Sequence, residues 1–205
     1  PPYGIGLPQN GKLIKSSDLK KNLFSEDLRH INTKSDSEIL LNIFAHELHL
    51  HSKESFTPDD VFYAVAGVHR RVKGAYAVVA LISDRGIVAF RDPMGIRPLC
   101  YGTRDIGGKT ETMIASESVA LDSAGFKLVR DIMPGEAIFI DINGEIHTRL
   151  CTKNSGHSPC IFEFVYFARP DTIIDGISVY SARMKMGQYL AKKISNQWKD
   201  HDIDV

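Results

Sequence analysis

The sequence predicts an α+β fold in which two stacked antiparallel sheets are flanked by helices, a four-layer αββα sandwich. About eight short apolar stretches, separated by turns that contain Gly, Pro or Asn, indicate antiparallel strands. The stretches at 75–82 and 88–91 are apolar on both sides, so their sheet has to be covered on both faces. Two amphipathic helical patterns earlier in the chain supply part of that cover.

The composition is that of an ordinary globular protein and excludes several classes of partner. Lys and Arg number 25 and are balanced by 25 Asp and Glu, which argues against a broad surface for nucleic acid or anionic lipid. No apolar run approaches the roughly 20 residues of a membrane helix, so we expect a cytoplasmic protein. The cysteines, Cys100, Cys151 and Cys160, have no CxxC spacing, so neither a disulfide framework nor a zinc site is predicted.

The first part of the chain predicts a short strand and three helices. The strand covers 3–7 and is followed by a turn at Asn10-Gly11, the commonest hairpin dipeptide. A helix follows over 16–27. The next begins with a capping box, with Ser35 as N-cap and Glu38 at the third position. A third starts at Thr57-Pro58 and is expected to end at Gly74.

The remainder predicts mostly short strands. Turns at 83–86 and 92–95 join the strands at 75–82 and 88–91 to a third that ends at Gly102, and we expect these three to be adjacent in one sheet. The later elements are a polar loop over 103–111, a strand over 112–115, a helix over 117–124, strands over 127–132, 136–142 and 145–150, a linker over 151–159, a strand over 161–167 and a helix over 179–198.

Two places could carry chemistry, and each also has a plain structural interpretation. Asn10-Gly11 is a hairpin turn on local grounds, but an Asn amide and a Gly backbone N–H aimed at one point would form an oxyanion hole. Asp36 complements the dipole of the helix that it opens, or it receives a substrate ammonium group. The residues alone leave both alternatives open.

Other polar clusters favour structural roles. His46 and His49 lack the i, i+4 spacing of a zinc helix and indicate a solvated helix end. Arg91, Asp92 and Arg97 suggest a turn ion pair, and the segment 116–118 suggests a helix cap. None of the cysteines has a recognisable neighbouring base, so none is predicted to be a nucleophile.

Four motifs, taken in order, resemble the class II glutamine amidotransferase family. They are Asn10-Gly11, Thr33–Glu38, Arg91–Leu99 and Ala115–Glu117. The stretches Phe164–Asp171 and Ser178–Arg183 are similar to the branch of this family that acts on phosphoribosyl pyrophosphate. The resemblance covers essentially all 205 residues.

The resemblance implies a fold of the N-terminal-nucleophile hydrolase type and release of ammonia from glutamine. In this family an N-terminal cysteine attacks the side-chain amide of glutamine. By resemblance, Asn10 and Gly11 form the oxyanion hole and Asp36 holds the glutamine α-amino group. The ammonia would then displace pyrophosphate from phosphoribosyl pyrophosphate to give 5-phosphoribosylamine, the first committed step of purine (IMP) synthesis.

The resemblance also implies an organisation. An amidotransferase domain would cover 1–177, and a phosphoribosyltransferase domain, which uses Mg²⁺, would begin over 178–205. A homo-oligomer, by resemblance a tetramer, is expected. No cofactor or metal is expected in the 205 residues themselves. Cys160 lies where some relatives bind an iron–sulfur cluster, but one ligand of four favours an ordinary buried cysteine.

The chain departs from the family pattern at its first residue, and this keeps other functions open. The family's nucleophilic cysteine is the first residue of the mature chain, whereas this sequence begins with Pro1, so we expect the stretch that carries that cysteine to be missing. We therefore expect a fragment whose fold is incomplete at the N-terminus and which is inactive by itself. The alternatives are another class II amidotransferase, such as glucosamine phosphate synthase or asparagine synthetase, and a non-catalytic sandwich used for assembly.

Overall fold

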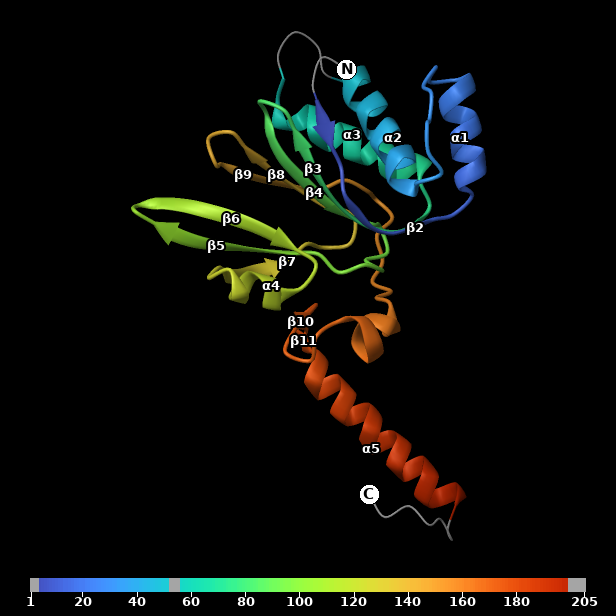
Figure 1. Ribbon diagram of the computed structural model, residues 1–205, viewed down its shortest axis with the longest axis vertical. Coiled ribbons are helices and arrows are strands. Elements are labelled where there is room, and N and C mark those ends of the chain that lie inside the picture. The colour runs from blue at the N-terminus through green and yellow to red at the C-terminus, as the bar shows by residue number, and fades with distance from the viewer. Residues whose placement is uncertain (1–3, 52–55, 199–205) are drawn as a thin grey trace.

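The structure is a computed structural model that describes residues 4–51 and 56–198. Figure 1 shows four layers in the upper part of the molecule: α2 and α3, a large sheet, a small sheet, and α4. The predicted αββα sandwich of two antiparallel sheets is therefore confirmed. A fifth helix, α5, extends away from the layers.

The large sheet has six strands and is antiparallel throughout. Its order is β1-β3-β4-β8-β9, and β2 also pairs with β3. The strands are β1 (Ile5–Gly6), β2 (Gln9–Leu13), β3 (Gly74–Ile82), β4 (Gly86–Arg91), β8 (Glu136–Asp141) and β9 (Ile146–Leu150). The central strands β3 and β4 carry buried apolar residues on both faces, because helices cover one face and the small sheet covers the other.

The small sheet has three strands in the order β6-β5-β7. They are β5 (Cys100–Ile106), β6 (Lys109–Ala115) and β7 (Lys127–Asp131). One face packs on the large sheet through an apolar cluster: Ala77, Ala89, Leu99, Tyr101, Ile132 and Ile138. The other face is covered by Leu121 of α4 (Ser118–Ser123) and by Phe126, which follows that helix.

Three helices precede β3, as predicted: α1 (Ser16–Ser25), α2 (Asp36–His51) and α3 (Pro58–Arg71). The last two cover the outer face of the large sheet and enclose the main core, which includes Phe44, Val65, Tyr76 and Phe90. The predicted start of α3 is confirmed, because Thr57 and Asp60 form a reciprocal capping box. Gly74 is the first residue of β3 and not the end of the helix.

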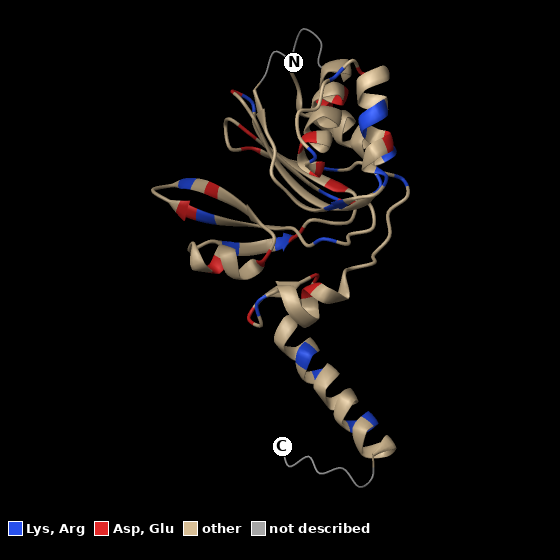
Figure 2. Cartoon of the chain, turned by 45° about the vertical axis from the view of Figure 1, so that its right-hand side comes forward, with Lys and Arg blue, Asp and Glu red and all other residues tan. Residues whose placement is uncertain are grey.

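The C-terminal part contains η1 (Glu163–Phe167), a π-helix, the small hairpin β10 (Ile173–Ile174) and β11 (Ile177–Ser178), and α5 (Val179–Gln197). The predicted helix over 179–198 is confirmed, and the Ser178 hydroxyl caps it by accepting the Ser181 N–H at 3.3 Å. Figure 2 shows basic but no acidic ribbon along α5, whereas both signs of charge are interspersed over the sandwich.

Two predicted strand arrangements are wrong. The third strand after 75–82 and 88–91 is β5, which lies in the small sheet rather than beside β4. The carboxylate of Asp92 explains this, because it accepts the N–H groups of Met94, Ile96 and Arg97 and holds the loop open across the sandwich. Asn10-Gly11 is not a turn either, since both residues lie inside β2 and pair with β3.

Three smaller predictions also fail. The expected loop over 103–111 is a hairpin of β5 and β6 that turns at Gly107-Gly108, where both residues have positive φ. The expected strand over 161–167 is helical, ending in η1, because burial falls on Phe164 and Ala168, one helical turn apart. Glu38 does not complete a capping box with Ser35, because its carboxylate accepts the N–H groups of 32 and 33.

Candidate functional site

A cleft between the two sheets contains one of the predicted site residues. Its volume is about 300 Å³, and its wall consists of Pro8, Gln9, Asn10, Ala77, Val79, Leu99, Ile114, Ala115 and Ser116. Asn10 pairs with Ala77, whose side chain packs between the sheets, so the Asn10 side chain faces the same space. The cleft therefore has apolar walls and an amide at its edge, which suits a small polar ligand.

Gly11 is required by the close approach of β2 to β3. Its φ is +150°, and a Cβ at this position would lie 1.9 Å from the carbonyl oxygen of Ala75. No side chain fits there. The peptide that joins Asn10 to Gly11 is thus held tightly beside the cleft, within a strand and not in the hairpin turn that the sequence indicated.

Asp36 is tied to the end of the same strand and does not line the cleft. Its carboxylate accepts the Leu13 N–H at 3.0 Å and forms an ion pair with the Lys12 ammonium at 2.9 Å. The side chain is only 8% exposed. Burial opposes its ionisation, but the Leu13 N–H and the Lys12 ammonium outweigh burial and lower the pKa of Asp36. Asp36 is therefore an ionised carboxylate that binds an ammonium group, here the ammonium of Lys12.

The strand β2 thus connects the three predicted residues. It contains Asn10 and Gly11, and its last residue, Leu13, donates its N–H to Asp36. Gln9 and Ser116, which line the cleft with Asn10, were not predicted as site residues. The side-chain amide oxygen of Gln9, Oε1, is buried without a hydrogen-bond partner among the described residues. Ser116 lies in the motif Ala115–Glu117, but a helix cap was the only role that the sequence suggested for it.

The predicted turn ion pair among Arg91, Asp92 and Arg97 is wrong. Arg91 binds Asp175, and Arg97 binds Glu163 at 2.6 Å, so both guanidinium groups reach the C-terminal part. Asp92 instead accepts backbone N–H groups of its own loop. Local spacing could not predict partners that lie 66 and 84 residues away.

Comparison with known proteins decides the family. The model of the glutamine amidotransferase domain family matches residues 4–123, more than half of the chain. The chain belongs to this family. Amidophosphoribosyltransferases of Escherichia coli and Pseudomonas aeruginosa are 57% and 56% identical over the whole chain, and that of Saccharomyces cerevisiae is 47% identical. The chain spans 41% of the length of each of these relatives.

Two solved structures resemble this glutamine amidotransferase domain in fold. The glutamine phosphoribosylpyrophosphate amidotransferase from B. subtilis, complexed with ADP and GMP, matches with a TM-score of 0.74 at 32% identity. It covers 92% of this chain, which corresponds to 38% of that chain. A structure of the allosteric regulatory enzyme of purine biosynthesis matches with a TM-score of 0.75 at 31% identity over 93% of this chain. The predicted N-terminal-nucleophile hydrolase type of fold is confirmed.

The relatives also bear on the alternatives left open by the sequence. The whole-chain matches include 164–171 and 178–183, the stretches that resemble the phosphoribosyl pyrophosphate branch. This supports that branch over glucosamine phosphate synthase and asparagine synthetase. Within the described residues, no helix is long and apolar enough to cross a membrane.

The three cysteines of this amidotransferase domain have different surroundings, and none is among the residues that line the cleft. Burial is the main cause that raises the pKa of both Cys100 and Cys151 to about 12. Cys100 packs with α4, Cys151 lies in the main core, and the Cys160 N–H binds the Ile96 carbonyl oxygen.

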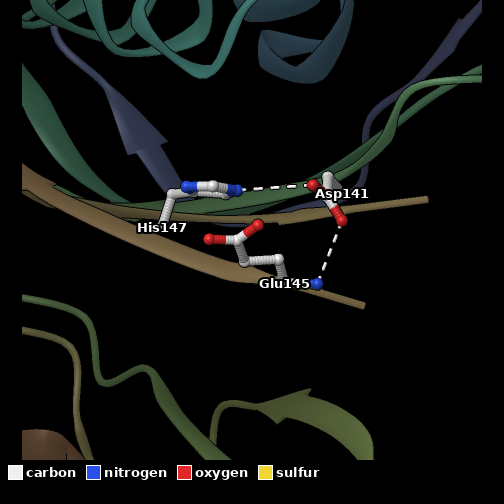
Figure 3. Close-up of side chains that lie close together, drawn as sticks. All are labelled: Asp141, Glu145 and His147. Carbon is white, nitrogen blue, oxygen red and sulfur yellow. Dashed lines mark hydrogen bonds and ion pairs between the residues drawn. The ribbon is translucent and has the colours of Figure 1, made fainter. Parts of the chain in front are cut away.

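One group of side chains has the spacing of a metal site. Figure 3 shows Asp141, Glu145 and His147 at the turn between β8 and β9, with one ligand atom of each within 4.8 Å of the others. The Asp141 carboxylate accepts the N–H groups of Asn143 and Glu145 at 2.9 Å each, and His147 lies 3.4 Å from it. These contacts are those of a closed turn, and the group is distant in the fold from β2. His46, also considered earlier, is paired with Asp27.

Two larger hollows contain none of the residues that the family motifs indicate for glutamine. One, of about 650 Å³, lies between α3 and residues 149–154. The other, of about 700 Å³, lies beside His157 and Asp175. Size alone would favour these two, but the cleft beside Asn10 is where the polar groups and the family motifs coincide.

Proposed function

We propose that the chain is the glutamine amidotransferase part of an amidophosphoribosyltransferase. It would release ammonia from glutamine for the conversion of phosphoribosyl pyrophosphate to 5-phosphoribosylamine. The observation that carries the proposal is the position of Asn10 in the cleft between the sheets, with Gly11 fixed beside it. The whole-chain similarity to amidophosphoribosyltransferases supports the same assignment.

The roles of the site residues follow from their chemistry. The Asn10 side-chain amide and the Gly11 N–H would stabilise the oxyanion that develops on the glutamine amide oxygen when the amide carbon is attacked. Donors held rigidly before the reaction are worth more than mobile ones, and the close contact of Gly11 with Ala75 supplies that rigidity. Asp36 would hold the glutamine α-amino group by exchanging the Lys12 ammonium for that of the substrate.

The nucleophile has to come from outside these 205 residues. Cys100 and Cys151 are buried thiols whose pKa is raised to about 12 by burial, so neither forms a thiolate near neutral pH. None of the three cysteines is among the residues that line the cleft. We assign attack on the glutamine amide to the N-terminal cysteine that the family resemblance implies, with its own α-amine as base.

The second half-reaction would take place in a phosphoribosyltransferase domain that begins within 178–205, so that 1–177 form the amidotransferase domain. Ammonia released at the cleft would displace pyrophosphate there, with Mg²⁺ bound by that domain and the phosphoribosyl pyrophosphate. The proposal includes a homo-oligomer, a tetramer by resemblance, and a cytoplasmic location. It assigns no iron–sulfur cluster to Cys160.

The test compares two nitrogen sources in the full-length protein. Pyrophosphate release from phosphoribosyl pyrophosphate is measured with glutamine and then with ammonium chloride. Asn10→Ala should lower the glutamine-dependent kcat on the order of 100-fold or more, because one oxyanion donor is lost. Asp36→Asn should mainly raise the KM for glutamine. Neither variant should alter the ammonia-dependent rate.

Asp18→Asn is the matched control, because Asp18 is an exposed acid in the first turn of α1. It should leave both reactions unchanged. Glutamine-dependent activity of Asn10→Ala equal to wild type would remove Asn10 from the site. A protein that releases no pyrophosphate with either nitrogen source would refute the proposed function as a whole.

A further inference from the structure

Arg91 is a fully engaged guanidinium at the boundary between the sandwich and the C-terminal part. It is 1% exposed, and its five N–H donors are matched by five acceptors. Three are backbone carbonyl oxygens, those of Arg97, Ile132 and Gly95, at 2.6 to 3.0 Å. The other two are the carboxylate oxygens of Asp175, at 2.7 and 2.9 Å. A paired, bidentate geometry of this kind fixes orientation as well as distance.

Asp175 is placed for this contact by the β10–β11 hairpin. It occupies the hairpin turn with a φ of +49°, and Gly176 follows with a φ of +74°. The His157 imidazole lies 3.0 Å from the second carboxylate oxygen. A non-glycine residue in this left-handed conformation is uncommon, so the turn presents the carboxylate to Arg91 at a conformational cost.

A second contact holds the same hairpin from the small sheet. The Glu117 carboxylate accepts the Arg169 N–H at 2.9 Å and the buried Thr172 hydroxyl at 2.8 Å. The Ser118 hydroxyl accepts the Ile173 N–H at 2.9 Å. The segment 169–175 is therefore attached to both sheets, to one through β4 and to the other through the residues that precede and open α4.

Both contacts start directly beside the wall of the cleft. Arg91, in β4, is the strand-pairing partner of Ala77, in β3. Ala77 lines the cleft and is also the partner of Asn10, in β2. Glu117 follows Ser116, which lines the opposite wall. The hairpin is thus joined to one wall of the cleft through the pairing of Arg91 with Ala77. It is joined to the other wall through the peptide bond between Ser116 and Glu117.

The same hairpin leads into α5 without a break. Val179, the first residue of α5, is buried against Phe164 and Ile174, and its N–H binds the Thr172 carbonyl oxygen at 3.1 Å. Arg183 donates to the carbonyl oxygens of Phe164 and Ala168 at 2.7 and 2.8 Å. These contacts attach α5 to the hairpin, which is itself attached beside both walls of the cleft.

We propose that the β10–β11 hairpin is the joint that sets the cleft relative to the acceptor domain, and that Asp175 is a positioning residue for ammonia transfer. This inference rests on the proposed function. Asp175 touches neither substrate. Its ion pair with Arg91 fixes the position of the β10–β11 hairpin and α5 relative to the ammonia-releasing cleft. Ammonia released at the cleft then reaches the acceptor and is not lost to solvent.

The test measures the yield of transfer in the full-length protein. With saturating glutamine and phosphoribosyl pyrophosphate, glutamate formed and pyrophosphate released are quantified together. Asp175→Asn keeps the shape of the side chain and removes its charge, and should raise the ratio of glutamate to pyrophosphate about threefold or more. The ammonia-dependent rate should remain near that of wild type, because free ammonia bypasses the joint.

Asp171→Asn is the control. It removes the same charge four residues earlier in the chain, from an exposed side chain that pairs with Arg169. It should keep the wild-type ratio. If Asp175→Asn does not fold, Thr172→Val removes the hydroxyl bond to Glu117 with little change of shape and should shift the ratio in the same direction. A wild-type ratio in both variants, with thermal stability alone reduced, would overturn the inference. Absence of glutamine-dependent activity in the wild type would instead refute the proposed function.

Discussion

The main core beneath α2 and α3 and the C-terminal part from η1 to α5 bury their apolar side chains very differently. In the main core Leu40, Ile43, Phe44 and Phe90 are completely inaccessible to solvent. In α5 only Val179 is buried, whereas the large side chains Tyr180, Met184, Tyr189 and Leu190 are between 50% and 72% exposed. The sandwich is therefore stabilised by its own packing, and α5 presents an apolar surface that the described residues leave uncovered.

The contacts within the sandwich also differ in kind from the contacts between the sandwich and the C-terminal part. Within the sandwich, strand ladders hold each sheet together, and apolar clusters fill the spaces between α3, the large sheet, the small sheet and α4. Between the sandwich and the C-terminal part, the closest contacts are charged or polar: Arg91 with Asp175, Arg97 with Glu163, and Glu117 with Thr172. Directional bonds define an orientation more sharply than apolar contacts do, which fits a connection whose purpose is alignment.

The largest expected effect is on the free energy of unfolding, and it follows from the difference in packing between the two regions. Phe90→Ala should destabilise the protein by about 3 to 5 kcal/mol, because Phe90 is buried against Phe44, Tyr76 and His69 and its loss leaves a cavity. Tyr189→Ala, in which a 72% exposed ring on α5 is removed, should cost less than about 0.5 kcal/mol. Urea denaturation of the two variants measures the difference. Equal losses would mean that α5 is as well packed as the sandwich.

The contrast also explains how much of the fold could be predicted from the sequence. The helices α1, α2, α3 and α5 and the hairpin of β8 and β9 were located correctly, because each is encoded by nearby residues such as the Thr57 cap or the Asn143-Gly144 turn. Asn10-Gly11 was misassigned because its local preference for a turn is overridden by pairing with Tyr76 and Ala77, more than 60 residues away. The location of β5 depended on the hydrogen bonds of Asp92, which no periodicity encodes.

The site was predictable only in part for the same reason. Asn10 and Asp36 were singled out by residue type and by the family resemblance, and both are associated with β2. Asp175 was not, because the pattern around it is an ordinary Asp-Gly turn and its partner Arg91 lies 84 residues earlier. A contact between distant segments leaves no spacing in a single sequence, whatever its importance to the structure.

Acid should weaken the main core through His69. This histidine is largely buried and its Nδ1 lies 2.9 Å from the Tyr76 hydroxyl; burial lowers its pKa from 6.5 to about 4. Between these values the unfolded chain binds a proton that the folded chain does not, so stability is complete above pH 6.5 and decreases as the pH falls towards 4. The loss should be about 2 to 3 kcal/mol. Residues 161–198 contain no histidine, so this source of acid sensitivity belongs to the sandwich.

Urea denaturation at several pH values checks this expectation. His69→Gln should flatten the dependence between about pH 4 and 6.5, since it removes the titrating group. His49→Gln, at an exposed position near the end of α2, should retain the wild-type slope. An unchanged slope in His69→Gln would show that other groups account for the acid sensitivity of the core.

The smallest expected effect is the change in stability when a glycine within a helix is replaced by alanine. Its sign should differ between the two regions. In α3, a Cβ on Gly67 would lie 2.0 Å from the carboxylate of Glu47, a residue of α2 that Arg71 holds against α3. Gly67→Ala should therefore destabilise the sandwich by about 1 to 3 kcal/mol. In α5, nothing lies within 4 Å of a Cβ on Gly187. Gly187→Ala should stabilise that helix by about 0.5 to 1 kcal/mol through its higher helix propensity.

Amide hydrogen exchange resolves the two helices separately and is the appropriate measurement, because α5 can open without unfolding the sandwich. Exchange in α3 should become faster in Gly67→Ala, and exchange in α5 should become slower in Gly187→Ala. Performing the second measurement also in the full-length protein sharpens the comparison. If Gly187→Ala then speeds exchange in α5, the glycine is covered by a close partner there, and the exposed face of α5 is an interface with the acceptor domain and not a free surface.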